Sequence, residues 1–129
     1  MKHSFKVDAT LAAQRFVALT GTADTVGYPE NGQRLPIGIT LDTVKDTTQA
    51  IPVAGVGEIA KLLFDDTVTA GSLVASDTSG RGVPFSLANT TTSLTLASAY
   101  GGILVDAKVN ATGTIAHVLI QPGYDRVAG

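Results

Sequence analysis

Residues 38–42 read Gly-Ile-Thr-Leu-Asp, and residues 102–106 repeat the pattern as Gly-Ile-Leu-Val-Asp, 64 positions further on. At the same spacing Ile51 corresponds to Ile115. Short segments rich in β-branched residues fit a pleated, half-buried surface. The repeated stretch therefore predicts one strand in each of two related halves of the chain.

A second pair of segments supports the repeat. Residues 16–18, Phe-Val-Ala, and residues 73–75, Leu-Val-Ala, lie 57 positions apart, and an insertion in the polar stretch 88–93 accounts for the different spacing. The two halves are predicted to cover about 13–64 and 70–121. Because a few strands cannot bury their apolar faces alone, we expect the halves to pack around one core.

Turn residues recur at short intervals, and the segments between them are short and rich in Thr and Val. This pattern is typical of an all-β fold, here a small β-sandwich or barrel. The predicted strands are 15–20, 35–41, 50–54, 72–76, 83–87, 94–96, 103–108 and 114–121. Residues 58–64 carry apolar side chains at helical spacing. A strand is favoured there, and one short helix is the alternative.

The composition favours a compact chain with a neutral surface. Of 129 residues 44% are apolar and 16% charged, the formal net charge is −2 and Cys is absent; about a quarter charged is typical. The length fits one β domain, predicted at 11–129 behind an N-terminal arm at 1–10. Without Cys there is neither a disulfide nor a thiolate metal site. We expect no nucleic-acid or membrane partner, because the balance is weakly acidic and no apolar stretch reaches the roughly 18 residues that span a bilayer.

Two features that could indicate an enzyme are explained more simply by structure. Residues 55–60 fit Gly-x-Gly-x-x-Ala, with Asp77 some way downstream, but no strand–helix–strand unit surrounds them, so a tight bend is expected. His117 lies between apolar neighbours and is expected either to be packed in the fold or to lie at a rim. No Gly-x-Ser-x-Gly turn accompanies it.

Paired carboxylates do not change this interpretation. Asp65 and Asp66 are adjacent, so in a strand they would point to opposite faces. Asp42 and Asp106 end the two copies of the repeated stretch, and this matching position favours a structural role in accepting turn N–H groups. We therefore expect no enzymatic activity, no metal ion and no cofactor.

The N-terminal segment is the candidate docking site. Basic and apolar residues mix there: Lys2, His3, Phe5, Lys6 and Val7. An arm of this kind can add as a strand to the edge of a neighbour's sheet. The alternative is an end that frays or folds back on its own domain.

Several segments resemble the capsid decoration (cement) proteins of tailed bacteriophages. Residues 67–80 are similar to the family's Thr-Ala-Gly-Asp-Leu-Val segment and the Asp-x-x-Gly turn that follows it, with Ser72 where Asp is usual. Residues 35–39 and 101–106 resemble its two Ile-Gly-Ile/Val-Ala strands, and 115–120 its terminal strand. The similarity touches most of 13–121, and the polar segment 88–96 departs from it.

This resemblance implies a β-rich structural protein without enzymatic activity, made in the host cytoplasm and carried on the outer capsid surface of the virion. Such a protein binds the major capsid protein of an assembled head, often as a homotrimer, and bridges neighbouring subunits. The alternative is a small adhesin or carbohydrate-binding β-module of a fibre or cell surface. In that case Tyr28, Tyr100 and Tyr124 would stack on sugars.

Overall fold

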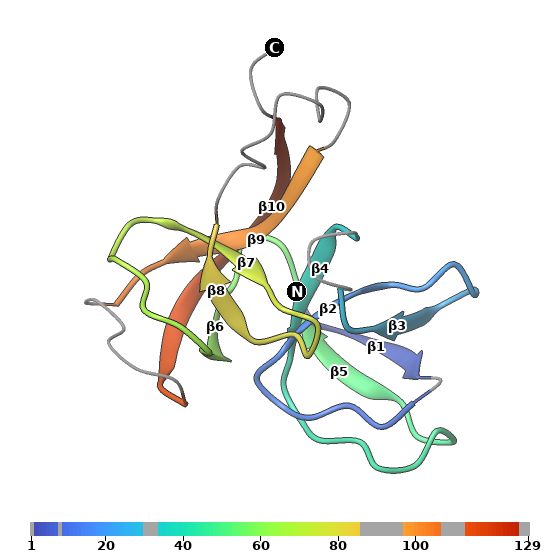
Figure 1. The fold of residues 1–129 in the computed structure, drawn as a ribbon. Helices are drawn as coiled ribbons and strands as arrows, with labels where there is room; N and C mark the ends of the chain where they lie inside the picture. Colours follow the sequence, from blue (N-terminus) through green and yellow to red (C-terminus); the bar gives the residue numbers. More distant parts are fainter. Residues whose placement is uncertain (1, 8, 30–33, 86–96, 107–112, 127–129) are drawn as a thin grey trace.

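The computed structural model describes residues 2–7, 9–29, 34–85, 97–106 and 113–126, and in these ranges the chain is all β with no helix. The first five strands are β1 (Lys2–Val7), β2 (Phe16–Leu19), β3 (Thr25–Gly27), β4 (Pro36–Thr40) and β5 (Ile51–Ala54). The next five are β6 (Ile59–Leu63), β7 (Leu73–Ser76), β8 (Gly82–Pro84), β9 (Ala97–Leu104) and β10 (Ile115–Arg126). The two groups lie side by side (Figure 1). The all-β prediction is confirmed, and 58–64 contains a strand rather than a helix.

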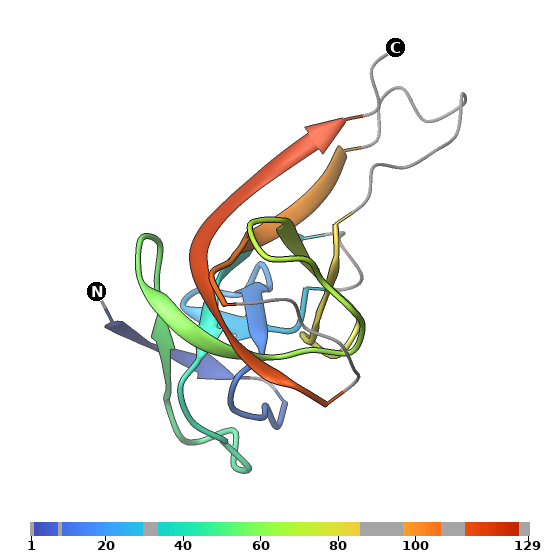
Figure 2. The ribbon, with the colours of Figure 1, turned by 90° about the vertical axis from the view of Figure 1, so that its left-hand side faces the viewer.

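Strands β1–β5 close into a barrel in the order β1-β3-β2-β4-β5, with β1 antiparallel to β5 and parallel to β3. Strands β6–β10 form a second sheet in the order β6-β10-β9-β7-β8. A bridge between Phe64 and Gly82 joins the two ends of this sheet. Strand β10 is long and strongly curved (Figure 2), and its pairing with β9 shifts register between Ile120 and Gly123.

The two sheets are equivalent strand for strand. Phe16 faces Ile39 in the first, and Leu73 faces Ile103 in the second. A parallel contact joins β1 to β3 in the barrel, and its counterpart is the parallel bridge between the ends of the second sheet. Equivalent residues differ in number by 57 for β1/β6 and β2/β7, by 56 for β3/β8, by 64 for β4/β9 and by 65 for β5/β10. The predicted relation between the halves is therefore present, and the extra residues of the second half lie between β8 and β9.

The register corrects two details of the predicted repeat. The first half was expected to end at 64, but β6 is the counterpart of β1 and opens the second half. Ile51 corresponds to Ala116 and not to Ile115, because the spacing between β5 and β10 is 65. Burial agrees with this assignment, since Ile51 and Ala116 lie in the cores while Ile115 is exposed.

Strand boundaries depart from the prediction mainly around β9. The strand expected at 103–108 begins at Ala97 and ends at Leu104. The strand expected at 94–96 and the end of the one expected at 83–87 lie outside the described residues. Strand β3 was not predicted, because three residues after a turn are too few to show a period.

The N-terminal segment is one of the strands of the barrel rather than a separate arm. Its residues pair with β5, and Lys6 and Val7 also pair with β3. Val7 is buried in the core of the barrel and Phe5 packs partly against it. Burial of these two side chains, which point to the same face of the strand, gives the segment a reason to fold back on its own domain.

The described residues form two apolar cores, and one of them is shared between the halves. The first core lies inside the barrel and is built from Val7, Leu11, Val17, Val26, Val44, Ile51 and Val53. The second lies on the inner face of the β6–β10 sheet and includes Phe16, Ile39 and Ala54 of the barrel. These three side chains lie on the outer face of the barrel and point away from its interior, because the alternate residues of β2 and β5 point inward. The outer face of the barrel thus packs into the second sheet.

The glycines of the repeated stretch are explained by a close approach between strands. A Cβ added to Gly38 would collide with the carbonyl oxygen of Ala54, and one added to Gly102 would collide with that of Leu119. Ala54 and Leu119 are equivalent in the two sheets. Glycine therefore begins both copies of the stretch because backbone from the neighbouring strand occupies the space of a side chain.

Candidate interaction surfaces

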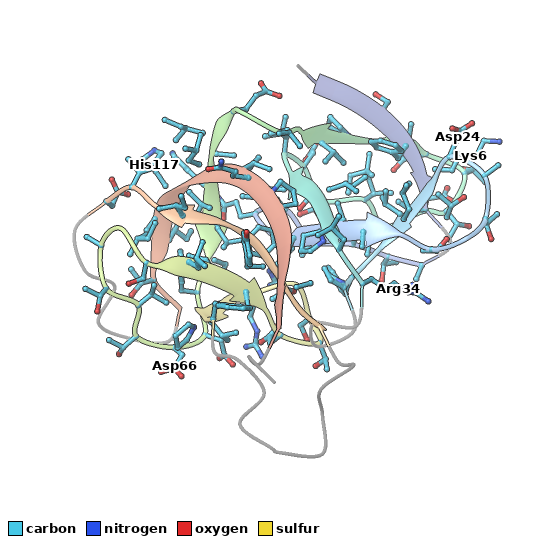
Figure 3. All side chains as sticks on the ribbon, turned by 90° about the horizontal axis from the view of Figure 1, so that it is seen from above. Lys6, Asp24, Arg34, Asp66 and His117 are labelled. Carbon is cyan, nitrogen blue, oxygen red and sulfur yellow. The ribbon has the colours of Figure 1, made fainter. Side chains whose placement is uncertain are left out.

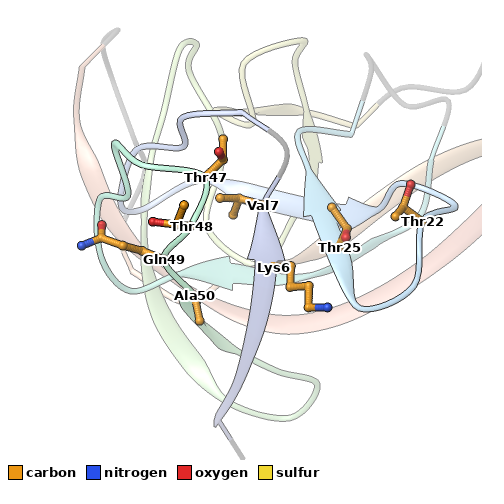
Figure 4. Close-up of a pocket in the computed structure, with 8 residues that line it drawn as sticks. All are labelled: Lys6, Val7, Thr22, Thr25, Thr47, Thr48, Gln49 and Ala50. Carbon is orange, nitrogen blue, oxygen red and sulfur yellow. The ribbon is translucent and has the colours of Figure 1, made fainter.

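A pocket of about 450 Å³ lies beside β1 on the barrel (Figure 4). We call it the polar pocket because most of the residues that line it are polar, although much of the lining surface is carbon. Lys6 and Val7 line it from β1, and Thr25 and Thr22 lie on the side to which Lys6 points. The rest is formed by residues 47–50, which precede β5. The wall offers hydroxyl and amide groups and one ammonium, with no carboxylate or imidazole among the lining residues. Such a surface can hydrogen-bond a polar partner but holds no acid–base pair.

The predicted docking residues differ in what they offer to a partner. For Lys2 and His3 the structure gives the backbone pairing with β5 and no description of the side chains. Phe5 is half-buried and Val7 is buried, so both serve the core. Lys6 is exposed and borders the polar pocket. Of the three side chains that the structure describes among these residues, Lys6 is thus the one in solvent.

His117 lies at the opposite end of the molecule from Lys6 (Figure 3) and pairs with Asp106. Oδ2 of Asp106 accepts the backbone N–H of His117 at 2.7 Å and lies 2.8 Å from the ring Nδ1. The backbone bond, followed by the side-chain bond, lowers the pKa of Asp106 from its ordinary value. Both side chains are nearly half exposed. The carboxylate fastens the segment after β9 to β10. A structural role was expected, but the N–H that Asp106 accepts belongs to a strand and not to a turn.

The remaining carboxylates singled out in the sequence organise turns. Asp42 accepts the N–H of Thr43 at 2.8 Å, and Asp66 accepts that of Thr67 at 2.7 Å. Asp65 points elsewhere and forms a salt bridge to Arg81 with an N–O distance of 3.2 Å. Asp65 and Asp66 therefore have separate partners, as expected of adjacent residues.

The turn between β7 and β8 and the turn before β6 are also held by side chains. Asp77 accepts the N–H groups of Ser79 and Arg81, both at 2.9 Å, and pairs with the guanidinium of Arg81. At Gly55, Glu58 closes a turn by donating its N–H to the Gly55 carbonyl and accepting the Gly55 N–H at 2.9 Å. This turn leads into strand β6 and not into a helix, so it lacks the helix N-terminus that binds a dinucleotide.

The tyrosines that could stack on sugars make internal contacts where their side chains are described. The Tyr28 hydroxyl accepts the N–H of Ala12 at 2.9 Å, and its ring packs against the barrel core. Tyr100 meets Phe85 edge to face, with ring centroids 5.3 Å apart. The side chain of Tyr124 lies outside the described part.

Two other kinds of feature are absent from the described residues. No group of three or more His, Asp or Glu residues lies close enough together there to hold a metal ion. The same ranges contain no helix with the length and apolar character that a membrane crossing would require.

An aliphatic row crosses the outer face of the second sheet. Adjacent strands place Ile59, Leu119, Ile103 and Leu73 opposite one another in register. Ile59 is 57% exposed and the other three are half-buried, while the alternate residues of these strands point into the shared core. We call these four residues the outer row. Sequence reasoning missed it, although apolar residues on both faces of a strand are a signal that both faces are covered.

The fold defines an all-β protein made of two tandem copies of a five-stranded unit. No family model and no curated protein matches the sequence. The fold is similar to the crystal structure of the head fiber gp8.5 N base of bacteriophage phi29, with a TM-score of 0.68. The match covers 94% of this chain and 93% of that one at 12% sequence identity. At this identity the comparison establishes a shared fold.

Proposed function

We propose that this chain is a structural protein of a bacteriophage head, which binds the outer surface of the assembled shell and stabilises it by bridging major capsid protein subunits. The observation that carries the proposal is the fold shared with a phage head fiber base over nearly the whole of both chains. The resemblance of residues 67–80 to capsid decoration proteins supports it from the sequence. The proposal includes a homotrimer carried on the virion and no enzymatic activity.

The physical chemistry of the surface suits this role. Packaged DNA presses outward on a shell, and a protein that spans neighbouring subunits adds contacts that exist only in the assembled state. Because many copies bind a symmetric lattice, a modest affinity at each site is sufficient. A surface with few charged side chains is also easily desolvated against another protein.

Lys6 and the polar pocket beside it form the docking surface that we propose on the barrel. The sequence predicted docking by Lys2, His3, Phe5, Lys6 and Val7. Since Phe5 and Val7 belong to the core, a deletion of residues 1–8 would remove a strand of the barrel and would confuse folding with docking. A substitution at Lys6 tests the same surface without this complication.

The proposal is tested by co-sedimentation of the purified chain with phage heads that lack it. We expect binding to expanded heads and not to immature shells. Lys6→Glu is expected to weaken binding to expanded heads at least about tenfold, which corresponds to about 1.4 kcal/mol. Lys45→Glu changes the charge equally at an exposed position outside the pocket and is expected to bind like the unmodified chain.

The two parts of the proposal fail in different ways. If the unmodified chain does not sediment with expanded heads, the proposed function is wrong. If it does and Lys6→Glu binds equally well, the function stands and the docking surface is elsewhere.

A further inference from the structure

The internal repeat shows what can cover the outer face of this five-stranded unit. In the barrel, Phe16, Ile39 and Ala54 occupy the outer face, and each is less than 5% exposed because the second sheet packs on it. Their counterparts by register are Leu73, Ile103 and Leu119. The outer face of the barrel is thus an interface within the chain, and the equivalent face of the second sheet carries the outer row.

We propose that the outer row is the surface through which this chain binds a second copy of itself. The four side chains of the row are all aliphatic, so a partner needs to supply an apolar surface and no matching charge. Burying partly exposed Ile and Leu side chains is favourable in proportion to the area removed from water. Sheet faces pack about 10 Å apart with interdigitated side chains, and the chain itself supplies such a face.

The shape of the surface beside the row favours a copy of the same chain. Ile59 and the neighbouring Val56 project, with 57% and 68% of their surface exposed. Next to them is a recess of about 230 Å³, lined by Val56, Leu119 and Ile120 among others. A projection and a recess on one surface are complementary, so the projection of one copy can enter the recess of the next around the three-fold axis of the proposed homotrimer.

Polar groups lie next to the row and complete the pattern of an interface. Lys61 and His117 pair with each other two residues along the strands from Ile59 and Leu119, and so lie on the same face. Both are exposed. Asp106, which holds His117, supplies the opposite charge. Polar groups of both signs beside an apolar row can hydrogen-bond across a contact whose centre is apolar.

The test is the mass of the chain in solution, measured by sedimentation equilibrium at up to about 100 µM, well above a micromolar Kd. We expect a multiple of the 13.2 kDa chain mass. Ile59→Lys is expected to raise the dissociation constant at least about tenfold and to shift the mass toward one chain. The fold tolerates this change, because the barrel has Lys2 at the equivalent position. Leu19→Lys alters a similarly exposed aliphatic residue on the barrel and is expected to leave the mass unchanged.

Several outcomes would overturn the inference. A single-chain mass for the unmodified protein, or an undiminished mass for Ile59→Lys, contradicts self-association through the row. If the unmodified chain is a monomer and Ile59→Lys loses binding to phage heads, the row belongs to the shell contact instead. Thermal unfolding of each variant shows that it is folded. The inference rests on the homotrimer of the proposed function and names the surface that forms it. Head binding is tested separately, because the capsid role fails if the unmodified chain does not sediment with expanded heads.

Discussion

Phe16→Ala tests whether the first barrel is held in the second sheet by the side chains of its outer face. Phe16 is fully buried and belongs to the core shared between the halves, although its strand is part of the barrel. Truncation of a buried Phe removes its transfer free energy and leaves a cavity, which together cost about 3–5 kcal/mol. Against a typical total of about 5–15 kcal/mol, the variant is expected to fold with greatly reduced stability.

The residue beneath the Phe16 ring makes the prediction specific. A Cβ added to Gly101 would collide with the ring, so Gly101→Ala overpacks the site and is expected to cost about 1–3 kcal/mol. In the Phe16→Ala background the added methyl group fills part of the cavity. The double variant is therefore expected to be more stable than the sum of the single effects by at least about 1 kcal/mol, within the range for residues in contact.

Urea unfolding, followed by circular dichroism, gives all four free energies of the cycle. Leu19→Ala is the matched control, because Leu19 lies on the same strand and is 51% exposed. Its effect is expected to stay within about 0.5 kcal/mol. A loss below about 1 kcal/mol for Phe16→Ala, or additive effects of Phe16→Ala and Gly101→Ala, would refute the packing described here.

Three further predictions concern Gly102, the buried hydroxyl of Thr40 and the carboxylate of Asp106. Gly102→Ala is expected to lower the free energy of unfolding by about 2 kcal/mol or more, because its Cβ meets backbone that cannot move aside; an unchanged urea midpoint would contradict this. The buried Thr40 hydroxyl donates to the Ala12 carbonyl at 2.7 Å and accepts the Arg15 N–H at 3.1 Å, so Thr40→Val is expected to cost about 1–3 kcal/mol in the same assay. The lowered pKa of Asp106 means that its contribution to stability is present above the unfolded value of about 3.9 and is lost as the pH falls through the lower folded value. The melting temperature of the unmodified chain should therefore exceed that of Asp106→Asn at neutral pH and converge with it in acid, and equal melting temperatures throughout would contradict this.

The fold class and the repeat could be predicted because the information is local. Gly38 and Ile39 on β4 and Gly102 and Ile103 on β9 have the same structural setting, so the same glycine and the same isoleucine recur. The turn residues between strands also act locally, through their own backbone preferences. The strand assigned to 58–64 was favoured correctly, although its spacing also fitted a helix.

The role of β1 could not be predicted because it depends on distant residues. Strand β1 pairs with β5, almost fifty residues further on, and nothing within 2–7 identifies that partner. The N-terminal segment was predicted to be a separate arm because of its position before the first predicted strand and its basic residues. Its counterpart β6 was found as a strand but assigned to the wrong half for the same reason.

The docking surface was predicted from the composition of one segment, whereas the outer row is assembled from four strands. Ile59, Leu119, Ile103 and Leu73 become neighbours only through the sheet order and its register. Each of them is an ordinary aliphatic residue in the sequence. A surface of this kind becomes visible once the two halves are compared face by face.

Ile37 and Gly101 occupy equivalent positions in the two units. Their difference explains why the outer face of the barrel packs into the second sheet and not the reverse. Ile37 lies just before Gly38 and packs against the core of its own barrel, while Gly101 precedes Gly102 and leaves room for the Phe16 ring. The barrel thus fills its interior with its own side chains, and the second sheet takes side chains from the barrel. Since the interior of the barrel is occupied, it cannot accept the outer row of the second sheet in the same way. Within these two units one aliphatic face of the second sheet is thus left uncovered, and it is the face that we assign to a second copy.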